Sequence, residues 1–180
     1  MMATSDRGLC AGLGLAGGGC GAGTASGGIG YPAAMQAILF IGIQATGKSS
    51  FYASRFADTH VRINLDMLRT RNREARLLEL CCQTQQPFVV DNTNPARADR
   101  EGYISAAKAA GMAVVGYYFE SSIEPALKRN AERRGERQVP ERGVRGAHAR
   151  LEIPSWDEGF DELHYVRLEE GGFHIEGWRQ

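Results

Sequence analysis

An eight-residue segment at 42–49 limits the possible folds of this chain more than any other part of the sequence. It reads GIQATGKS, comes directly after the apolar run AILFI, and precedes a helical pattern. A glycine-containing turn between a strand and a helix can point backbone N–H groups inward, and the start of the helix adds the positive end of its dipole. In this context the pattern G-x-x-x-x-G-K-[ST] predicts a phosphate-binding loop (P-loop, Walker A motif) for a nucleoside triphosphate.

The residues of this loop have separate expected roles. Lys48 would reach the β- and γ-phosphates of ATP, and the Ser49 hydroxyl would bind Mg²⁺. The other residues expected to contact ATP are Gly42, Gln44, Ala45, Thr46, Gly47 and Ser50. ATP and Mg²⁺ are therefore the expected cofactors.

Short apolar runs alternate with helical patterns from residue 35 onward. Strands are expected at 37–41, 61–64, 87–91 and 113–120, and helices at 48–56, 67–84, 96–110 and 123–134. Nearly continuous apolar strands are typical of a parallel sheet that helices cover on both faces. The alternating order predicts an α/β protein with a doubly wound parallel sheet, which together with the loop gives a P-loop NTPase fold.

Residues 1–34 differ in composition from the rest of the chain. They hold 11 of its 23 glycines and only two charged residues. So few large side chains cannot offset the entropy that ordering the segment would cost. We therefore predict a disordered, dispensable tail at 1–34 and one domain at 35–180, a length that suits a single hydrophobic core.

The overall charge and the cysteines exclude several classes of protein. Basic and acidic residues number 21 each, so binding to a polyanion or a membrane by bulk charge is not expected. No apolar run has the length needed to cross a bilayer. The four cysteines show no metal-ligand spacing or disulfide framework, which fits a reducing compartment. We expect a cytoplasmic protein without a membrane partner, and the sequence leaves its oligomeric state open.

Two aspartates follow predicted strands at what would be the same edge of the sheet. Asp66, beside the phosphate-binding loop, could take a proton from an attacking hydroxyl, or could simply cap the helix that follows. Arg69 lies three residues further on, a spacing that places both side chains on one side of a helix. Asp91 ends the strand at 87–91, where it could lie near Mg²⁺ or form part of a turn.

Four segments together resemble the 5′-kinase domain of polynucleotide kinases and its relatives, small ATP-dependent kinases of AAA-type and zeta-toxin-like kind. They read GIQATGKSS, INLDMLR, VVDNTNPARADREGY and LKRNAERRGERQVP. The resemblance covers about residues 35–160, and the second and third segments are its specific part, because P-loops are widespread. It implies transfer of the γ-phosphoryl group of ATP to a hydroxyl, namely the 5′-hydroxyl of a polynucleotide.

The resemblance also implies roles for individual residues. Asp66 would be the general base on the acceptor hydroxyl, and Arg69 would hold the phosphate of the acceptor. Asp91 falls on the acidic position of the family at the end of the third strand, and Asn94 falls on its TN motif. Both would lie on the acceptor side, and Asp91 would also be a metal ligand beside Ser49.

An arginine-rich lid at about 129–150 would cover the transferred phosphoryl group. The resemblance does not separate Arg133 from Arg134, because this segment is one residue longer than the family version. A closing segment with Trp156 and Phe160 would pack the lid helix against the sheet. Ala45 replaces a common glycine of the family, a change expected to be tolerated if φ at that position is negative.

The acceptor is the open part of this interpretation. Zero net charge and scattered tyrosines do not indicate a surface for single-stranded bases. A small-molecule kinase acting on a sugar, nucleoside or antibiotic hydroxyl could use the same residues. An ATP-hydrolysing switch or binding module is a further alternative, although it would need no base directed at an acceptor.

Overall fold

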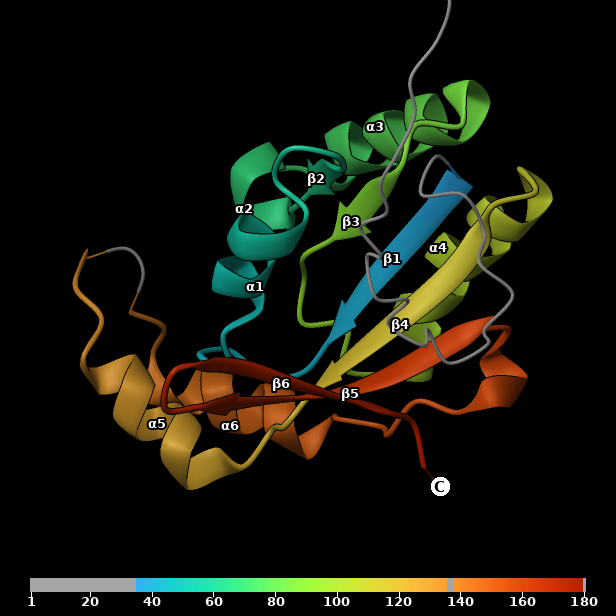
Figure 1. Ribbon diagram of the computed structural model, residues 1–180. Helices are drawn as coiled ribbons and strands as arrows, with labels where there is room; N and C mark the ends of the chain where they lie inside the picture. The colour runs from blue at the N-terminus through green and yellow to red at the C-terminus, as the bar shows by residue number, and fades with distance from the viewer. Residues whose placement is uncertain (1–34, 136–137, 180) are drawn as a thin grey trace, which may run out of the picture. The chain divides into compact units, whose positions relative to one another are not determined.

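The sheet of the protein has six strands, in a computed structural model that describes residues 35–135 and 138–179 (Figure 1). The predicted tail lies outside the described residues. The strands are β1 (Gln36–Ile41), β2 (Val61–Ile63), β3 (Phe88–Val90), β4 (Ala113–Phe119), β5 (Glu162–Glu169) and β6 (Gly172–Gly177). Their order is β2-β3-β1-β4-β5-β6. All neighbouring strands are parallel except β5 and β6, which form an antiparallel hairpin. The predicted α/β fold with a mostly parallel sheet is confirmed.

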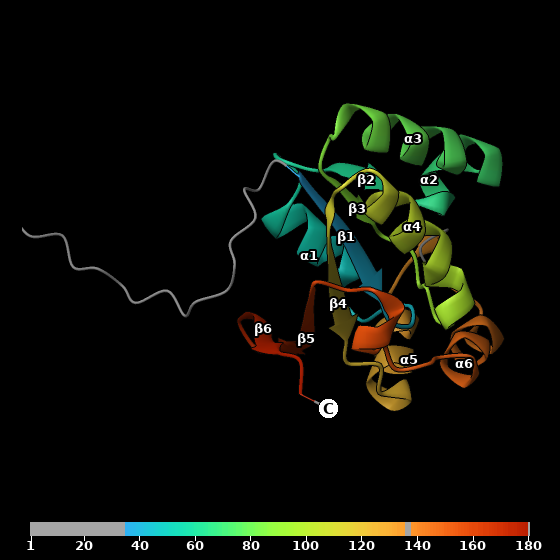
Figure 2. The ribbon, with the colours of Figure 1, turned by 90° about the vertical axis from the view of Figure 1, so that its right-hand side faces the viewer.

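Helices cover both faces of this sheet. They are α1 (Lys48–Arg55), α2 (Leu65–Leu68), α3 (Arg71–Thr84), α4 (Arg97–Ala109), α5 (Ile123–Ala131), α6 (Glu141–Ala149) and the short 3₁₀ helix η3 (Trp156–Glu158). Figure 2 shows α1 on one side of β1 and α3 and α4 on the other. The alternation of β1 explains this division, because Leu39 packs with the α3 and α4 side chains and Phe40 packs with Phe51 of α1.

The structure corrects three sequence expectations about the elements. The helix expected at 67–84 is two helices, α2 and α3, separated by Arg69 in a left-handed conformation (φ 70°) and by the N-cap Thr70. The helix expected at 123–134 ends at Ala131. The sequence reasoning did not predict α6 or the β5–β6 hairpin, whose alternating and partly exposed residues lack the continuous apolar runs of the central strands.

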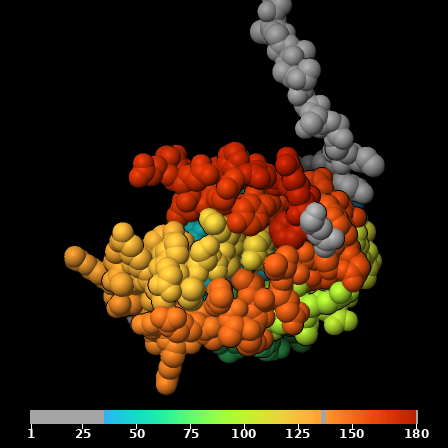
Figure 3. Space-filling view, turned by 90° about the horizontal axis from the view of Figure 1, so that it is seen from below, coloured from blue at the N-terminus to red at the C-terminus, as the bar shows by residue number. Residues whose placement is uncertain are grey.

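The closing segment is buried at only one of its two aromatic residues. Phe160 is 6% exposed and belongs to the core on the α3 and α4 side, whereas Trp156 is 45% exposed. The expectation that both would supply packing area is therefore wrong for Trp156. Beyond η3, the hairpin brings the C-terminal part of the chain beside α5 and α6 (Figure 3).

Candidate active site

The P-loop connects the carboxyl end of β1 to α1 through three residues with positive φ. These are Gly42 (φ 145°), Ala45 (φ 62°) and Gly47 (φ 95°). A Cβ at Gly42 would lie 3.1 Å from the Phe119 carbonyl oxygen, so this glycine is required by both conformation and space. The condition for tolerating alanine at position 45, a negative φ, is not met, since Ala45 adopts the left-handed conformation that glycine tolerates best.

The Lys48 side chain lies inside the P-loop and binds its backbone carbonyls. Its ammonium donates to the Gly42 carbonyl at 2.8 Å and to the Ile43 carbonyl at 2.5 Å, and the residue is only 8% exposed. Burial lowers the pKa of Lys48 from 10.5 to about 8, while the nearby Asp91 carboxylate opposes and the positive charge of Arg133 adds to the lowering. In the absence of a phosphate, Lys48 is therefore mostly charged at pH 7 and loses its proton as the pH rises through about 8.

The lowered pKa of Lys48 predicts proton uptake on nucleotide binding. Phosphate groups favour the charged ammonium and raise its pKa, so binding returns a proton to every neutral Lys48. Uptake per bound ADP, without metal, should rise from about 0.1 at pH 7 to about 0.9 at pH 9, and affinity should fall as pH rises above 8. Calorimetry in buffers of different ionisation enthalpy measures the uptake. A value that stays flat across this pH range would contradict the assignment.

Ser49 and Asp91 meet at the start of α1. The Ser49 hydroxyl donates to Asp91 Oδ2 at 2.9 Å, although the two residues are 42 positions apart in the sequence. Asp91 follows β3 and is 3% exposed. The same oxygen accepts a hydrogen bond from Nε of Arg62, on β2, at 2.9 Å. The structure thus brings together the two predicted metal ligands and adds a cation that the sequence reasoning did not identify.

The Ser49 and Asp91 oxygens suit Mg²⁺. Magnesium prefers hard oxygen ligands, keeps several waters, and usually takes one or two protein ligands plus substrate phosphates. Among the described residues, no group of three or more His, Cys, Asp or Glu side chains is placed to hold a metal ion. An ion at this point would therefore depend on these two side chains and on nucleotide phosphates.

Asp66 lies on the one-turn helix α2, directly after β2. The N-cap of this helix is Asn64, whose side chain accepts from the Met67 amide at 3.0 Å, so the alternative that Asp66 is the cap is wrong. The Leu65 amide donates to the Asn92 side chain at 2.9 Å, and the Asn64 amide group donates to the Asp91 carbonyl. These bonds attach α2 to the end of β3, and the Asp66 side chain is left exposed.

Arg69 is not on the same helical face as Asp66. It is the C-cap of α2, and its left-handed backbone ends the helix before the expected i+3 relation can form. Both residues are nevertheless exposed and three positions apart, with Asp66 inside α2 and Arg69 at its C-terminal end. Asn94 is different, because it is 4% exposed and its amide donates to the Phe40 carbonyl at 2.8 Å. This hydrogen bond of the Asn94 side chain is with β1, so Asn94 supports the strand that leads into the P-loop.

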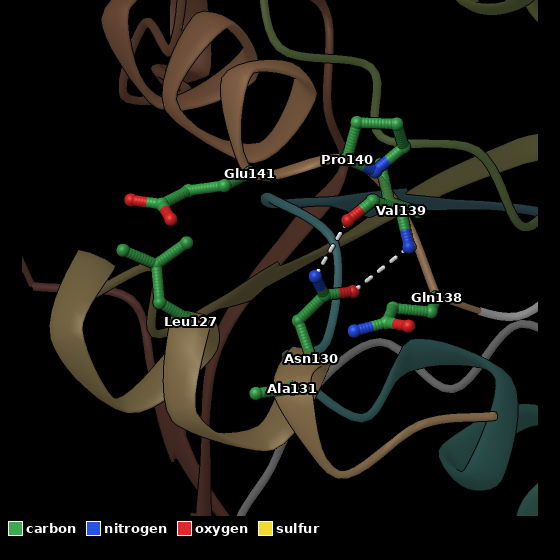
Figure 4. Close-up of a pocket in the computed structure, with 7 residues that line it drawn as sticks. All are labelled: Leu127, Asn130, Ala131, Gln138, Val139, Pro140 and Glu141. Atoms are coloured by element: carbon green, nitrogen blue, oxygen red, sulfur yellow. Dashed lines mark hydrogen bonds between the residues drawn. The ribbon is translucent and has the colours of Figure 1, made fainter.

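The lid segment contacts the P-loop through α5. Arg129 donates from Nε to the Ala45 carbonyl at 2.7 Å. Arg133, two residues past the end of α5, is half-buried and close enough to influence Lys48, whereas Arg134 is exposed. Asn130 fixes the base of the lid, since its side chain donates to the Val139 carbonyl at 2.7 Å and accepts from the Val139 amide at 3.1 Å (Figure 4).

The comparisons with known proteins agree with this geometry. A family model described as an AAA domain matches residues 38–154, a range that includes the P-loop, Asp66, Asp91 and the lid. The chain belongs to this AAA domain family.

One curated relative of the AAA domain is the bifunctional polynucleotide phosphatase/kinase of Schizosaccharomyces pombe, 25% identical over 135 residues and 73% of this chain. The chain spans about a third (33%) of the length of that relative.

No helix within residues 35–135 and 138–179 combines the length and apolar character of a membrane span.

Solved structures share the fold of the AAA domain. A gluconokinase from Sinorhizobium meliloti is 20% identical, with a TM-score of 0.52 over 74% of this chain and 82% of that one. Kti12 from Chaetomium thermophilum, solved in complex with ADP-AlF3, is 16% identical, with a TM-score of 0.55 over 73% of this chain and 88% of that one. At these identities the likeness shows the fold.

The sequence reasoning missed several residues that build the site of this AAA domain. Arg100 of α4 is fully buried and donates to the Asn94 and Pro95 carbonyls at 3.1 Å each, which fixes the turn after β3. Phe173 of β6 lies against the P-loop, where a Cβ at Gly47 would come within 2.9 Å of its ring. Only the contacts across the fold reveal these roles, because nothing in the local sequence around these residues indicates them.

Proposed function

We propose that this AAA domain transfers the γ-phosphoryl group of ATP to the 5′-hydroxyl of a polynucleotide. The observation that carries the proposal is the position of Asp66, an exposed carboxylate on α2. This helix is tied to the Asp91 carbonyl by Asn64 and to the Asn92 side chain by the Leu65 amide. A carboxylate beside a phosphate-binding loop can take the proton of an attacking hydroxyl. A domain that only hydrolyses ATP as a switch has no need of such a group.

The phosphate side of the reaction would be served by the P-loop. Lys48 would leave the loop carbonyls for the β- and γ-phosphates, and the backbone N–H groups at the start of α1 would face the same anion. Ser49 and Asp91 would hold Mg²⁺, which when bound neutralises charge on phosphate oxygens. Catalysis then comes from positioning and charge neutralisation, as expected for phosphoryl transfer.

Two features support an acceptor that carries phosphate. Arg69 and Arg73 are exposed on either side of the start of α3, close in sequence to Asp66, and Arg73 donates to the Leu68 carbonyl at 3.3 Å. Guanidinium groups are suited to bind phosphate oxygens. The polynucleotide phosphatase/kinase relative points to the same class of acceptor. We propose that Arg69 holds the phosphate that follows the accepting nucleoside.

We propose Arg133 as the lid arginine, because its charge acts on Lys48 and Arg134 is exposed. Arg133→Ala should lower transfer by about 10³-fold, the scale of an arginine that stabilises the transition state, and Arg134→Ala should have a small effect. Loss of the Arg133 charge should also raise the pKa of Lys48, which moves the onset of proton uptake on ADP binding to higher pH. Equal losses of transfer in the two variants would contradict the assignment.

The acceptor is tested by comparing kcat/KM for 5′-hydroxyl oligonucleotides of increasing length, nucleosides, and sugars such as gluconate. A rise in kcat/KM from nucleoside to dinucleotide, lost in Arg69→Ala, would support a polynucleotide acceptor held by its phosphate. Phosphorylation of only the sugars or nucleosides would replace the acceptor and leave the roles of Lys48 and Asp66 intact.

A further inference from the structure

The side chain of Arg62 occupies the point where the Ser49 and Asp91 oxygens converge. Arg62 is the central residue of β2, and its neighbours Val61 and Ile63 pack into the core on the α3 side. Because side chains alternate along a strand, Arg62 points to the opposite face, where α1 begins. Its charged group therefore lies beside the predicted metal ligands, at the edge of solvent.

The contacts of Arg62 form a closed arrangement with both ligands. Its Nε donates to Asp91 Oδ2 at 2.9 Å, one terminal nitrogen donates to the Ser49 hydroxyl at 3.0 Å, and the same nitrogen also contacts Asp91 Oδ2. Ser49 donates to that carboxylate oxygen as well. Asp91 Oδ2 thus accepts from Arg62 Nε, from the terminal nitrogen of Arg62 and from the Ser49 hydroxyl.

This arrangement is incompatible with a metal ion at the same oxygen. A guanidinium has five N–H donors and no acceptor, so it cannot be a metal ligand, and its positive charge repels a divalent cation. An ion that binds Asp91 Oδ2 and Ser49 must displace Arg62. The carboxylate side chain is 2% exposed and the arginine side chain 30% exposed, so Arg62 is the partner with room to move.

We propose that Arg62 is a tethered cation that neutralises Asp91 in the metal-free site and withdraws when the divalent metal enters. The proposal rests on the proposed metal and nucleotide site at Ser49 and Asp91. A buried carboxylate without a partner is strongly unfavourable, and Arg62 removes that penalty before metal arrives. The ring of Tyr52, 5.4 Å from the guanidinium carbon, already contacts the arginine and offers a surface along which it can withdraw.

The competition sets the affinity of the site for metal. The apparent affinity for a ligand falls with the fraction of protein in the competent state, here the state with Arg62 withdrawn. Arg62→Gln should therefore bind metal more tightly and be less stable without it. Arg62→Lys keeps a positive charge, so its affinity for metal should lie between those of the wild type and Arg62→Gln. Arg55→Gln is the matched control, since Arg55 is exposed on α1 and its described partners are the rings of Phe51 and Tyr117, away from Asp91.

The test measures Mn²⁺ binding to the full chain with saturating ADP, from the electron paramagnetic resonance signal of free Mn²⁺. We expect Arg62→Gln to bind Mn²⁺ about tenfold more tightly than the wild type. Its metal-free melting temperature should be about 4 °C lower, and Mn²⁺ with ADP should restore it. Arg55→Gln should match the wild type in both measurements. Unchanged or weaker Mn²⁺ binding by Arg62→Gln would overturn the proposal.

A second measurement on the wild type covers the case in which Arg62→Gln fails to fold. The Nε–H resonance of Arg62, assigned by its absence in Arg62→Lys, should shift when Mg²⁺ and ADP are added together and stay in place with ADP alone. A resonance that does not respond to Mg²⁺ with ADP would overturn the role of Arg62. If the wild type binds no Mn²⁺ in the presence of ADP, the metal site of the proposed function fails as well.

Discussion

Asp66→Asn is expected to reduce phosphoryl transfer by about 10³-fold, the scale of a lost general base, while ATP still binds. Asparagine has the same shape as aspartate and cannot take the acceptor proton. Asp66 is exposed and is not the cap of α2, so the substitution leaves the helix and its bonds to the β3 end in place. Initial rates of label transfer from ATP, with nucleotide affinity measured beside them, check both parts.

A matched substitution separates this effect from a general change in surface charge. Asp58 is also exposed, in the turn between α1 and β2, and Asp58→Asn should leave transfer unchanged. Wild-type rates in Asp66→Asn would remove this residue from the mechanism. Loss of ATP binding in the same variant would mean that Asp66 supports the nucleotide site instead.

Arg100→Met is expected to give the largest loss of stability. Arg100 is fully buried and forms two charge-assisted hydrogen bonds with Glu158, from Nε at 2.6 Å and from a terminal nitrogen at 2.7 Å. The substitution leaves the Glu158 charge buried without its partner, which costs about 3–5 kcal/mol in comparable cases. It also removes the Arg100 donor from the carbonyls of Asn94, Pro95 and Glu152, of which Pro95 keeps its bond from the Glu152 amide. Urea unfolding followed by circular dichroism measures the loss.

Arg97, three residues earlier on α4, provides the control. Its ion pair with Asp157 joins the same two parts of the chain, but both side chains are more than half exposed, at 51% and 67%. Exposed pairs contribute little because water screens them, so Arg97→Met should have almost the same urea midpoint as the wild type. Equal losses of stability in Arg100→Met and Arg97→Met would show that burial does not determine how much each ion pair contributes to stability.

The central strands and the P-loop could be predicted because their signals are local. The apolar runs of β1 and β4 and the GIQATGKS segment each identify themselves within a few residues. The break between α2 and α3 has no such signal, since no glycine or proline marks Arg69 and Thr70. Contacts from Asn92 and the Asn64 cap define α2, and they join residues far apart in the sequence. The hairpin was missed because only Leu163 and Val166 of β5 are buried and no residue of β6 is, so neither strand has a continuous apolar run.

The same distinction applies to the candidate site. Lys48, Ser49, Asp66 and Asp91 occur in recognisable patterns at the ends of strands, and the structure places Ser49 beside Asp91 as expected. Arg62 looks in the sequence like an ordinary charged residue in a short strand. Its role depends on the register that places β2 beside β3, with Arg62 opposite Val89, and a single sequence does not contain that information.

The central claim is that this domain delivers the γ-phosphoryl group of ATP to a hydroxyl. The most direct measurement incubates the protein with γ-labelled ATP, Mg²⁺ and a 5′-hydroxyl oligonucleotide, and then locates the label. We predict label at the 5′ end of the oligonucleotide, and none when Lys48→Ala replaces the wild type. Release of the label only as inorganic phosphate, with every hydroxyl acceptor left unlabelled, would contradict the account.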